Sequence, residues 1–119
     1  QFEERESKER SGDACDHWNL WNKDHDLLNE LGVSSYRFSI EWSRIEPNEG
    51  EWNEAAIQVY SDMIDSLIAK GIEPMVTLHH FSHPIWFEKM GGFEKKEKTS
   101  HYWSFGMHGS KLKRCFIRI

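Results

Sequence analysis

Two glutamates, Glu41 and Glu46, follow a stretch in which apolar and polar residues alternate. Paired carboxylates at the end of a strand could serve as a general acid and a general base. The alternative is that both are ordinary loop or salt-bridge carboxylates, and their spacing alone favours this alternative. We therefore predict no catalytic pair from these two residues.

Three histidines lie within a five-residue stretch, at His79, His80 and His83. A shared metal ion is disfavoured, because adjacent residues of a regular strand point to opposite faces and His79 and His80 could not both bind it. Two interpretations stay open. One histidine lines a polar pocket and hydrogen-bonds substrate hydroxyls, or the histidines are satisfied structural residues. We expect no metal and no cofactor.

Arg37 lies in the alternating stretch, between the aromatic residues Tyr36 and Phe38. This period of two is typical of a strand. A buried arginine needs a carboxylate partner, because an unpaired charge is costly to bury. No partner for Arg37 is obvious in the sequence.

A first helix is predicted to begin at Asp16, capped by the Asp16 carboxylate, and to end at Gly32. Its predicted buried face consists of Leu20, Leu27, Leu28 and Leu31, extended by Trp18 and Trp21. A strand is predicted at residues 33–40, and the loop at 41–52 follows it.

A second helix is predicted after Asn53, with Asn53 as its cap, Glu54 at its positive end and Gly71 after its last turn. Its apolar stripe consists of Ile57, Tyr60, Met63, Ile64, Leu67 and Ile68. A strand at residues 72–78 completes a strand–helix–strand unit, which requires parallel pairing. Parallel sheets need further strands, so the chain is predicted to be a slice of a larger α/β barrel or sheet.

Composition excludes some function classes. The 119 residues carry 15 Lys and Arg against 20 Asp and Glu, a net charge of −5, which disfavours nucleic acid or an anionic membrane as a partner. No apolar run is long enough for a transmembrane helix. The two cysteines, Cys15 and Cys115, indicate neither a zinc site nor a clear disulfide. We therefore expect a reducing, cytoplasmic location.

Several motifs occur together in one order along the chain. They are SGDACDHW at 11–18, YRFSIEWSRI at 36–45 and TLHHF at 77–81, followed by Trp86 and GGF at 91–93. In this combination the chain resembles the N-terminal part of family 1 glycoside hydrolases, the β-glucosidase and β-galactosidase family. The resemblance covers about residues 2–98.

This resemblance implies a retaining glycosidase on a (β/α)₈ barrel, of which the chain holds roughly the second and third strands with flanking helices. In the family, the acid/base glutamate lies in a Thr-x-Asn-Glu-Pro motif and the nucleophile in a Thr-Glu-Asn-Gly motif. Neither motif occurs in this sequence. The implied partner is a β-linked glycoside in the full-length enzyme, and we expect the chain alone to be inactive.

Two residues match family site positions. His80 matches the histidine of a Thr-Leu-x-His-Trp motif that hydrogen-bonds the sugar in the cleavage subsite. Arg37 matches the strand arginine that pairs with the nucleophilic glutamate. Phe81 stands where tryptophan is commoner, and Ser82 with His83 replaces the usual Asp-Leu, which alters the sugar pocket.

Strand alternation gives a prediction for the faces of the sheet. If His80 faces the barrel axis, Val76 and Leu78 share its side. On the earlier strand, we expect Arg37 to face the axis and Phe38 to face the helices.

Residues 99–119 contain no acidic residue, whereas the first 98 contain all 20. We therefore predict a partial glycosidase barrel at 1–98 and an off-family tail at 99–119, frameshifted or disordered. Two further function classes stay open. A non-catalytic carbohydrate-binding remnant would bind sugar weakly by itself, and a structural protein would form an oligomer that covers its strand edges.

Overall fold

The centre of the fold is a parallel sheet. A computed structural model describes residues 12, 14–109 and 116–118. Strand β1 (Ser35–Ser39) pairs in parallel with β2 (Glu73–Thr77), and Phe38 lies opposite Val76. A third strand, β3 (Phe116–Arg118), pairs in parallel with the other side of β2, so the order is β1-β2-β3. The predicted parallel pairing of the first two strands is confirmed.

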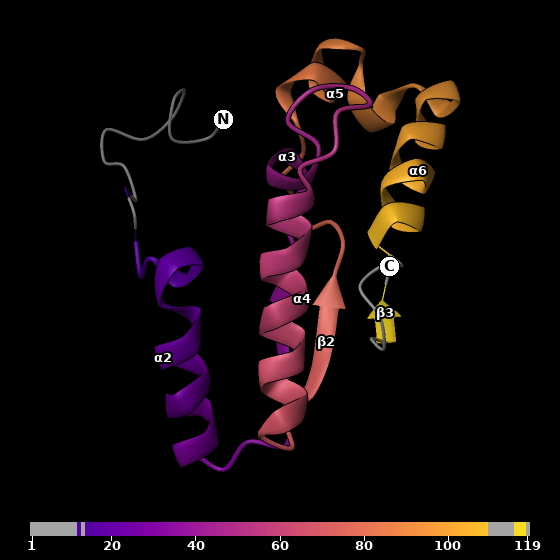
Figure 1. Ribbon diagram of the computed structural model, residues 1–119. Helices are drawn as coiled ribbons and strands as arrows, with labels where there is room; N and C mark the ends of the chain where they lie inside the picture. The colour runs from indigo at the N-terminus through magenta and orange to yellow at the C-terminus, as the bar shows by residue number, and fades with distance from the viewer. Residues whose placement is uncertain (1–11, 13, 110–115, 119) are drawn as a thin grey trace.

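Helix α4 (Glu54–Ala69) is the crossover between β1 and β2, and Figure 1 shows it running alongside β2. The Asn53 side chain accepts a hydrogen bond from the Ala56 N–H at 3.1 Å, which caps the helix as predicted. The helix ends at Ala69 with Lys70 as its C-cap, and Gly71 follows with φ 72°, a conformation that favours glycine. Its predicted stripe is buried except at Ile68, which is 41% exposed.

Helix α2 (His17–Glu30) differs from its prediction in two ways. Asp16 is the N-cap residue, but its carboxylate accepts from the Asn19 side-chain amide at 2.8 Å rather than from the helix backbone. Leu27 and Leu31 are 57% and 76% exposed, so their predicted burial is wrong.

The residues of α2 that face the rest of the chain are Trp18, Trp21, His25 and Leu28. Their spacing of three, four and three residues places them on one stripe of the helix. Trp18, Trp21 and Leu28 belong to the predicted buried face, His25 was not part of it, and the exposed Leu27 and Leu31 lie beside the stripe. The spacing of apolar residues predicted the helix correctly. Which side of the helix is buried depends on the positions of α4 and β1, which the sequence of α2 does not specify.

The main core fills the space between the sheet and α4. It contains Phe38 within β1 and Ile40 after it, Val76 within β2 and Leu78 after it, and Ile57, Met63, Ile64 and Leu67 of α4. Because Val76 pairs directly with Phe38, both lie on the helix-covered face. The prediction that Val76 and Leu78 share the open face is therefore wrong, whereas Phe38 faces the helices as predicted.

A second packed region lies beyond the ends of β1 and β2. It is formed by α3 (Trp42–Ile45), α5 (Ile85–Lys89), the 3-10 turns Gly92–Glu94 and Lys96–Lys98, and α6 (Thr99–Gly109). Trp42 is 1% exposed and stacks on Phe105 of α6 at 4.9 Å between ring centroids. We define Trp42, Trp86, Phe87, Tyr102 and Phe105 as the aromatic cluster.

Helix α6 and strand β3 both lie in the segment 99–119, and the predicted domain boundary at residue 98 stays a prediction. Among the described helices, none has the length and hydropathy needed to cross a bilayer.

Candidate functional site

The loops that follow β1 and β2 are tied together by Glu41. Its carboxylate accepts hydrogen bonds from the Ser43 hydroxyl and from the Ser82 hydroxyl, both at 2.8 Å. Its backbone N–H donates to the Tyr60 hydroxyl of α4 at 2.9 Å. Both carboxylate oxygens are thus engaged in holding the two loops in place. These contacts favour the structural interpretation of Glu41.

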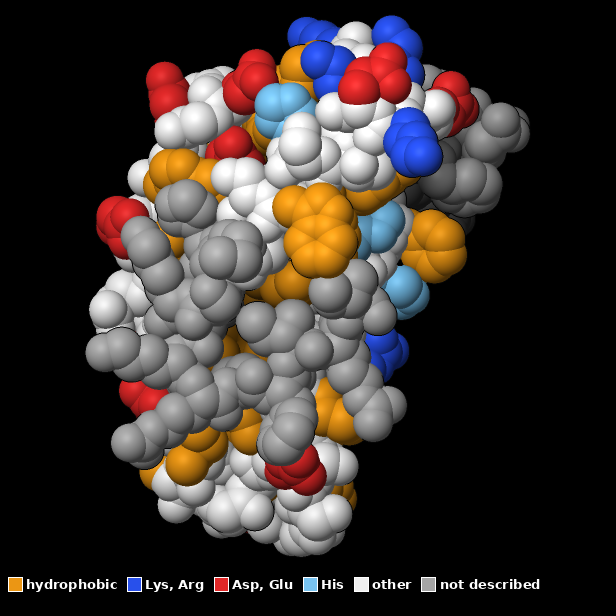
Figure 2. All heavy atoms as spheres, turned by 90° about the vertical axis from the view of Figure 1, so that its right-hand side faces the viewer, with side chains coloured by type: hydrophobic (Ala, Val, Ile, Leu, Met, Phe, Trp, Pro, Cys, Tyr) orange, Lys and Arg blue, Asp and Glu red, His pale blue; other side chains and the backbone are white. Residues whose placement is uncertain are grey.

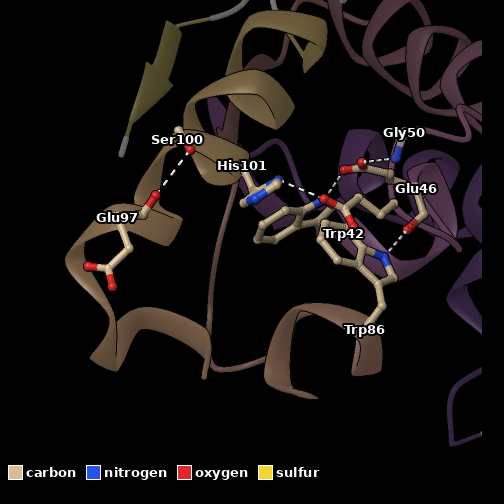
Figure 3. A network of polar contacts seen from close by, with 8 residues as sticks. Trp42, Glu46, Gly50, Trp86, Glu97, Ser100 and His101 are labelled. Carbon is tan, nitrogen blue, oxygen red and sulfur yellow. Dashed lines mark hydrogen bonds and ion pairs between the residues drawn. The ribbon is translucent and has the colours of Figure 1, made fainter. Parts of the chain in front are cut away.

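Glu46 is 4% exposed and belongs to a network beside the aromatic cluster (Figure 3). One carboxylate oxygen accepts from the Trp42 indole N–H at 2.7 Å, and the other accepts from the Gly50 N–H at 2.8 Å. The Trp86 indole N–H donates to the Glu46 backbone carbonyl at 3.1 Å. Glu46 therefore provides acceptors for the indole N–H groups of the buried Trp42 and the half-buried Trp86.

Arg37 lies on the face of the sheet opposite the main core. Ser35 and Ser39, two residues away on either side in β1, are exposed on the same face. The adjacent Phe38 is 7% exposed and lies on the other face. The Arg37 guanidinium donates to the Thr77 hydroxyl of β2 at 3.4 Å. Within the described part of the chain, no carboxylate lies at ion-pair distance from Arg37.

His80 lies in the loop beyond β2 and is exposed. The strand ends at Thr77, so its alternation does not extend to His80 and does not decide the direction of this side chain. Phe81 follows with φ 66°, which is a strained conformation for a non-glycine residue, and is 90% exposed. The His80 and Phe81 rings are 5.0 Å apart. Figure 2 shows hydrophobic and histidine side chains next to one another at the surface of its upper half.

His79 and His83 occupy a different environment from His80. The His79 ring packs against Phe93 at 4.9 Å and stacks with His83 at 5.9 Å. The His83 Nε2 contacts the Glu88 carboxylate at 2.7 Å. Burial lowers the pKa of His79, and the nearby His83 and His80 act in the same direction. The three histidines therefore do not converge on one point.

The loop contacts include residues that the sequence did not indicate. Ser82 and Tyr60 hold Glu41 from positions 41 and 19 residues away along the chain. No local pattern identifies such contacts, because they depend on the crossover that brings the strand ends together. The positive φ of Phe81 could not be predicted either, because such a conformation is expected from the sequence only where glycine occurs.

The comparisons with known proteins agree on one family. A family model described as Glycosyl hydrolase family 1 matches residues 1–110. The chain is 53% identical over 99 residues to Beta-glucosidase 1B of Phanerodontia chrysosporium, covering 78% of the chain and 18% of that protein. It is 39% identical over 110 residues to a 6-phospho-beta-glucosidase of Bacillus subtilis, covering 87% of the chain and 24% of that protein. The chain thus spans about a fifth to a quarter of these relatives.

The fold agrees with the sequence match. The chain superposes on the beta-glycosidase from Pyrococcus horikoshii with a TM-score of 0.80 and 46% sequence identity, over 82% of the chain and 23% of that structure. Family 1 glycosidases are (β/α)₈ barrels, and the parallel strands with a crossover helix seen here are the repeating unit of such a barrel. Because both the family match and the fold extend over most of its length, the chain belongs to glycosyl hydrolase family 1.

Proposed function

We propose that the chain is the part of a retaining β-glucosidase-type barrel that carries roughly its second and third strands. In this proposal His80 donates a hydrogen bond to a hydroxyl of the bound sugar. Arg37 pairs with a nucleophilic glutamate supplied from outside this chain. The observation that supports this best is that His80 is exposed in the loop beyond the C-terminal end of β2, where barrel enzymes bind substrate, and that Arg37 is exposed on the open face of the neighbouring parallel strand β1.

The open face of the sheet supports the role of Arg37. Water hydrates the exposed guanidinium in this chain, but a guanidinium buried inside a barrel needs a carboxylate partner, because an unpaired charge is costly to bury. In a closed barrel this face would be surrounded by the other strands and removed from water. The exposure of Arg37 is therefore a property of the isolated unit.

We propose further that the chain alone does not hydrolyse β-glucosides. A retaining mechanism needs two carboxyl groups about 5–5.5 Å apart. The carboxylate of Glu41 is bound by Ser43 and Ser82, and that of Glu46 is bound by Trp42 and Gly50. These contacts give both carboxylates a structural role and support the proposed lack of a catalytic pair.

The first test assays purified residues 1–119 on an aryl β-glucoside over several hours. We expect no turnover above that of the Glu41→Gln and His80→Ala variants, which control for contaminating glycosidases. Turnover that either substitution abolishes would contradict the proposed inactivity.

The second test measures the proposed site residues in a complete barrel. The matching segment of this chain replaces its counterpart in the Pyrococcus horikoshii beta-glycosidase, and kcat/KM is compared with and without His80→Ala. Loss of one or two hydrogen bonds to the sugar predicts a decrease of about 10- to 100-fold. His83→Ala is the matched control, because His83 bonds Glu88 rather than facing the proposed sugar site. Equal effects of the two substitutions would contradict the role of His80.

A further inference from the structure

The contact of α2 with the rest of the chain has a histidine at its centre. His25 is 0% exposed, and its Nδ1 lies 3.2 Å from the Ser66 hydroxyl of α4. The rings of Trp21 and Tyr36 lie 5.4 and 6.1 Å from the imidazole. The other ring nitrogen, Nε2, is buried and has no hydrogen-bond partner among the described residues. A neutral imidazole fits this arrangement, because one nitrogen meets the serine and the other carries no charge.

Titratable groups of α2, of the C-terminal end of α4 and of β1 surround His25. His17 of α2, whose ring is 6.1 Å away, bonds the Asp24 carboxylate through its Nδ1 at 2.5 Å. On the α4 side, the Lys70 ammonium bonds the Asp26 carboxylate at 3.0 Å. Both carboxylates that lie near His25 are thus already paired with another basic group. From β1, Tyr36 contributes only its ring and a hydroxyl whose pKa is raised by burial.

The surroundings oppose a positive charge on His25. Burial lowers the pKa of His25, and His17 and Lys70 lower it further, while Asp24 and Asp26 act in the opposite direction without prevailing. A protonated imidazole would place a second N–H donor, at Nε2, where no acceptor is found among the described residues. Two independent features, the unpartnered nitrogen and the surrounding charges, therefore disfavour the same protonation state.

We propose that His25 makes the packing of α2 against α4 and β1 depend on pH, so that the helix is held when the imidazole is neutral and released when it is protonated. This inference concerns the docking of α2 and does not depend on the proposed glycosidase function. The released state exposes His25 to water and binds a proton more readily than the docked state. Docking is therefore fully favourable above about pH 6.5, the ordinary histidine value, and weakens as the pH falls below it.

The contacts that Trp18 of α2 makes with Tyr60 and Arg44 do not change charge over the same pH range. The Trp18 ring packs edge-on against Tyr60 at 5.2 Å, and the Arg44 guanidinium lies 4.0 Å from the centre of the Trp18 ring. Tryptophan does not titrate, and tyrosine and arginine do so only well above neutral pH. A pH response confined to α2 would thus come from the side of the helix that carries His17 and His25.

The experiment measures amide hydrogen exchange of the full chain at pH 7.5 and pH 5.0. Rates are converted to protection factors, which removes the intrinsic pH dependence of exchange. We expect the protection of α2 to fall relative to α4 by up to about tenfold for each pH unit below 6.5, as one linked proton requires. Residues of α4 serve as the internal reference, because that helix is held by the main core.

Three variants identify the histidine responsible. His25→Asn keeps an amide that is able to bond Ser66 but does not titrate, and His25→Leu replaces the ring by an apolar side chain. Both are expected to remove the pH response of α2. His101→Gln on α6 is the matched control and is expected to leave it unchanged.

The possible outcomes separate clearly. A loss of the α2 response in His25→Asn or His25→Leu, with its retention in His101→Gln, supports the proposal. An α2 that is equally protected at both pH values overturns it. The same conclusion follows if both His25 variants keep the full response, or if α2 in the unaltered chain is already unprotected at pH 7.5.

Discussion

The two faces of the β1–β2 sheet differ sharply. On the helix-covered face, Phe38 and Val76 are 7% and 1% exposed beneath α4. On the open face, Arg37 is exposed and makes one 3.4 Å hydrogen bond to Thr77. The covered face is thus packed against α4, whereas no carboxylate among the described residues lies at ion-pair distance from Arg37 on the open face.

This difference separates the residues that stabilise the chain from those proposed to act on a substrate. A parallel sheet in a barrel buries both faces, so in a complete barrel the face that is open here would be covered by the other strands. Substitutions on the covered face should change the free energy of unfolding of the chain alone. Substitutions on the open face should change mainly the activity of a completed barrel.

The largest effect on stability is expected in the aromatic cluster. Trp42→Ala removes a side chain that is 1% exposed and stacked on Phe105, which should lower the free energy of unfolding by about 3–5 kcal/mol. Trp103→Ala is the matched control, because Trp103 is 65% exposed, and should change it by no more than about 0.5 kcal/mol. Urea denaturation followed by circular dichroism measures both. Similar losses for the two variants would show that the cluster is not a packed core.

A smaller effect is expected from the buried carboxylate of the same region. Glu46→Ala leaves the Trp42 indole N–H without its 2.7 Å acceptor, and an unsatisfied buried donor costs about 1–3 kcal/mol. Glu49→Ala is the control, since the Glu49 carboxylate is exposed at the surface and lies 3.6 Å from the His101 imidazole. The two free energies of unfolding are compared at neutral pH. A neutral result for Glu46→Ala would mean that water replaces the carboxylate.

Acidification should weaken the region around His79. Its pKa is lowered by burial, so the unfolded chain binds more protons than the folded one below about pH 6.5, and stability falls as the pH decreases. The dependence of the thermal midpoint on pH between 7.5 and 5 should be shallower in His79→Phe. His80→Phe, at an exposed position, is expected to keep the slope of the unaltered chain. An unchanged slope in His79→Phe would contradict this assignment.

How much of the fold the sequence predicts depends on whether a feature is local. Helix α4 was predicted closely, because Asn53 and Gly71 mark its ends and its apolar stripe meets the sheet. The four-residue helix α3 (Trp42–Ile45) was missed, since so short a segment has no periodicity to detect. The predicted buried face of α2 is right for Trp18, Trp21 and Leu28 but wrong for Leu27 and Leu31, because apolar spacing favours leucine whereas the helix presents His25 to α4.

The candidate site was predicted only where a single strand determines it. The position of Arg37 on the open face follows from alternation with Phe38, and the structure agrees. The same reasoning gave the wrong face for Val76, because the alternation was counted from His80. His80 lies beyond the end of β2 at Thr77, where the alternation no longer holds. The bond between Glu41 and Ser82 joins two loops and depends on the register of β1 with β2, which no local pattern specifies.

The smallest effect on stability is expected at Arg37, and it tests the comparison most directly. Arg37→Gln removes an exposed guanidinium whose hydrogen bond to Thr77 is 3.4 Å long, so the free energy of unfolding of the chain should change by less than about 0.5 kcal/mol. In the barrel chimera, the same substitution removes the proposed partner of the nucleophilic glutamate, and kcat should fall by at least about tenfold. Ser35→Ala, on the same open face, is the control and should change neither quantity. A large loss of stability with unchanged kcat would reverse the assignment, because Arg37 would then belong with the residues that hold the sheet together.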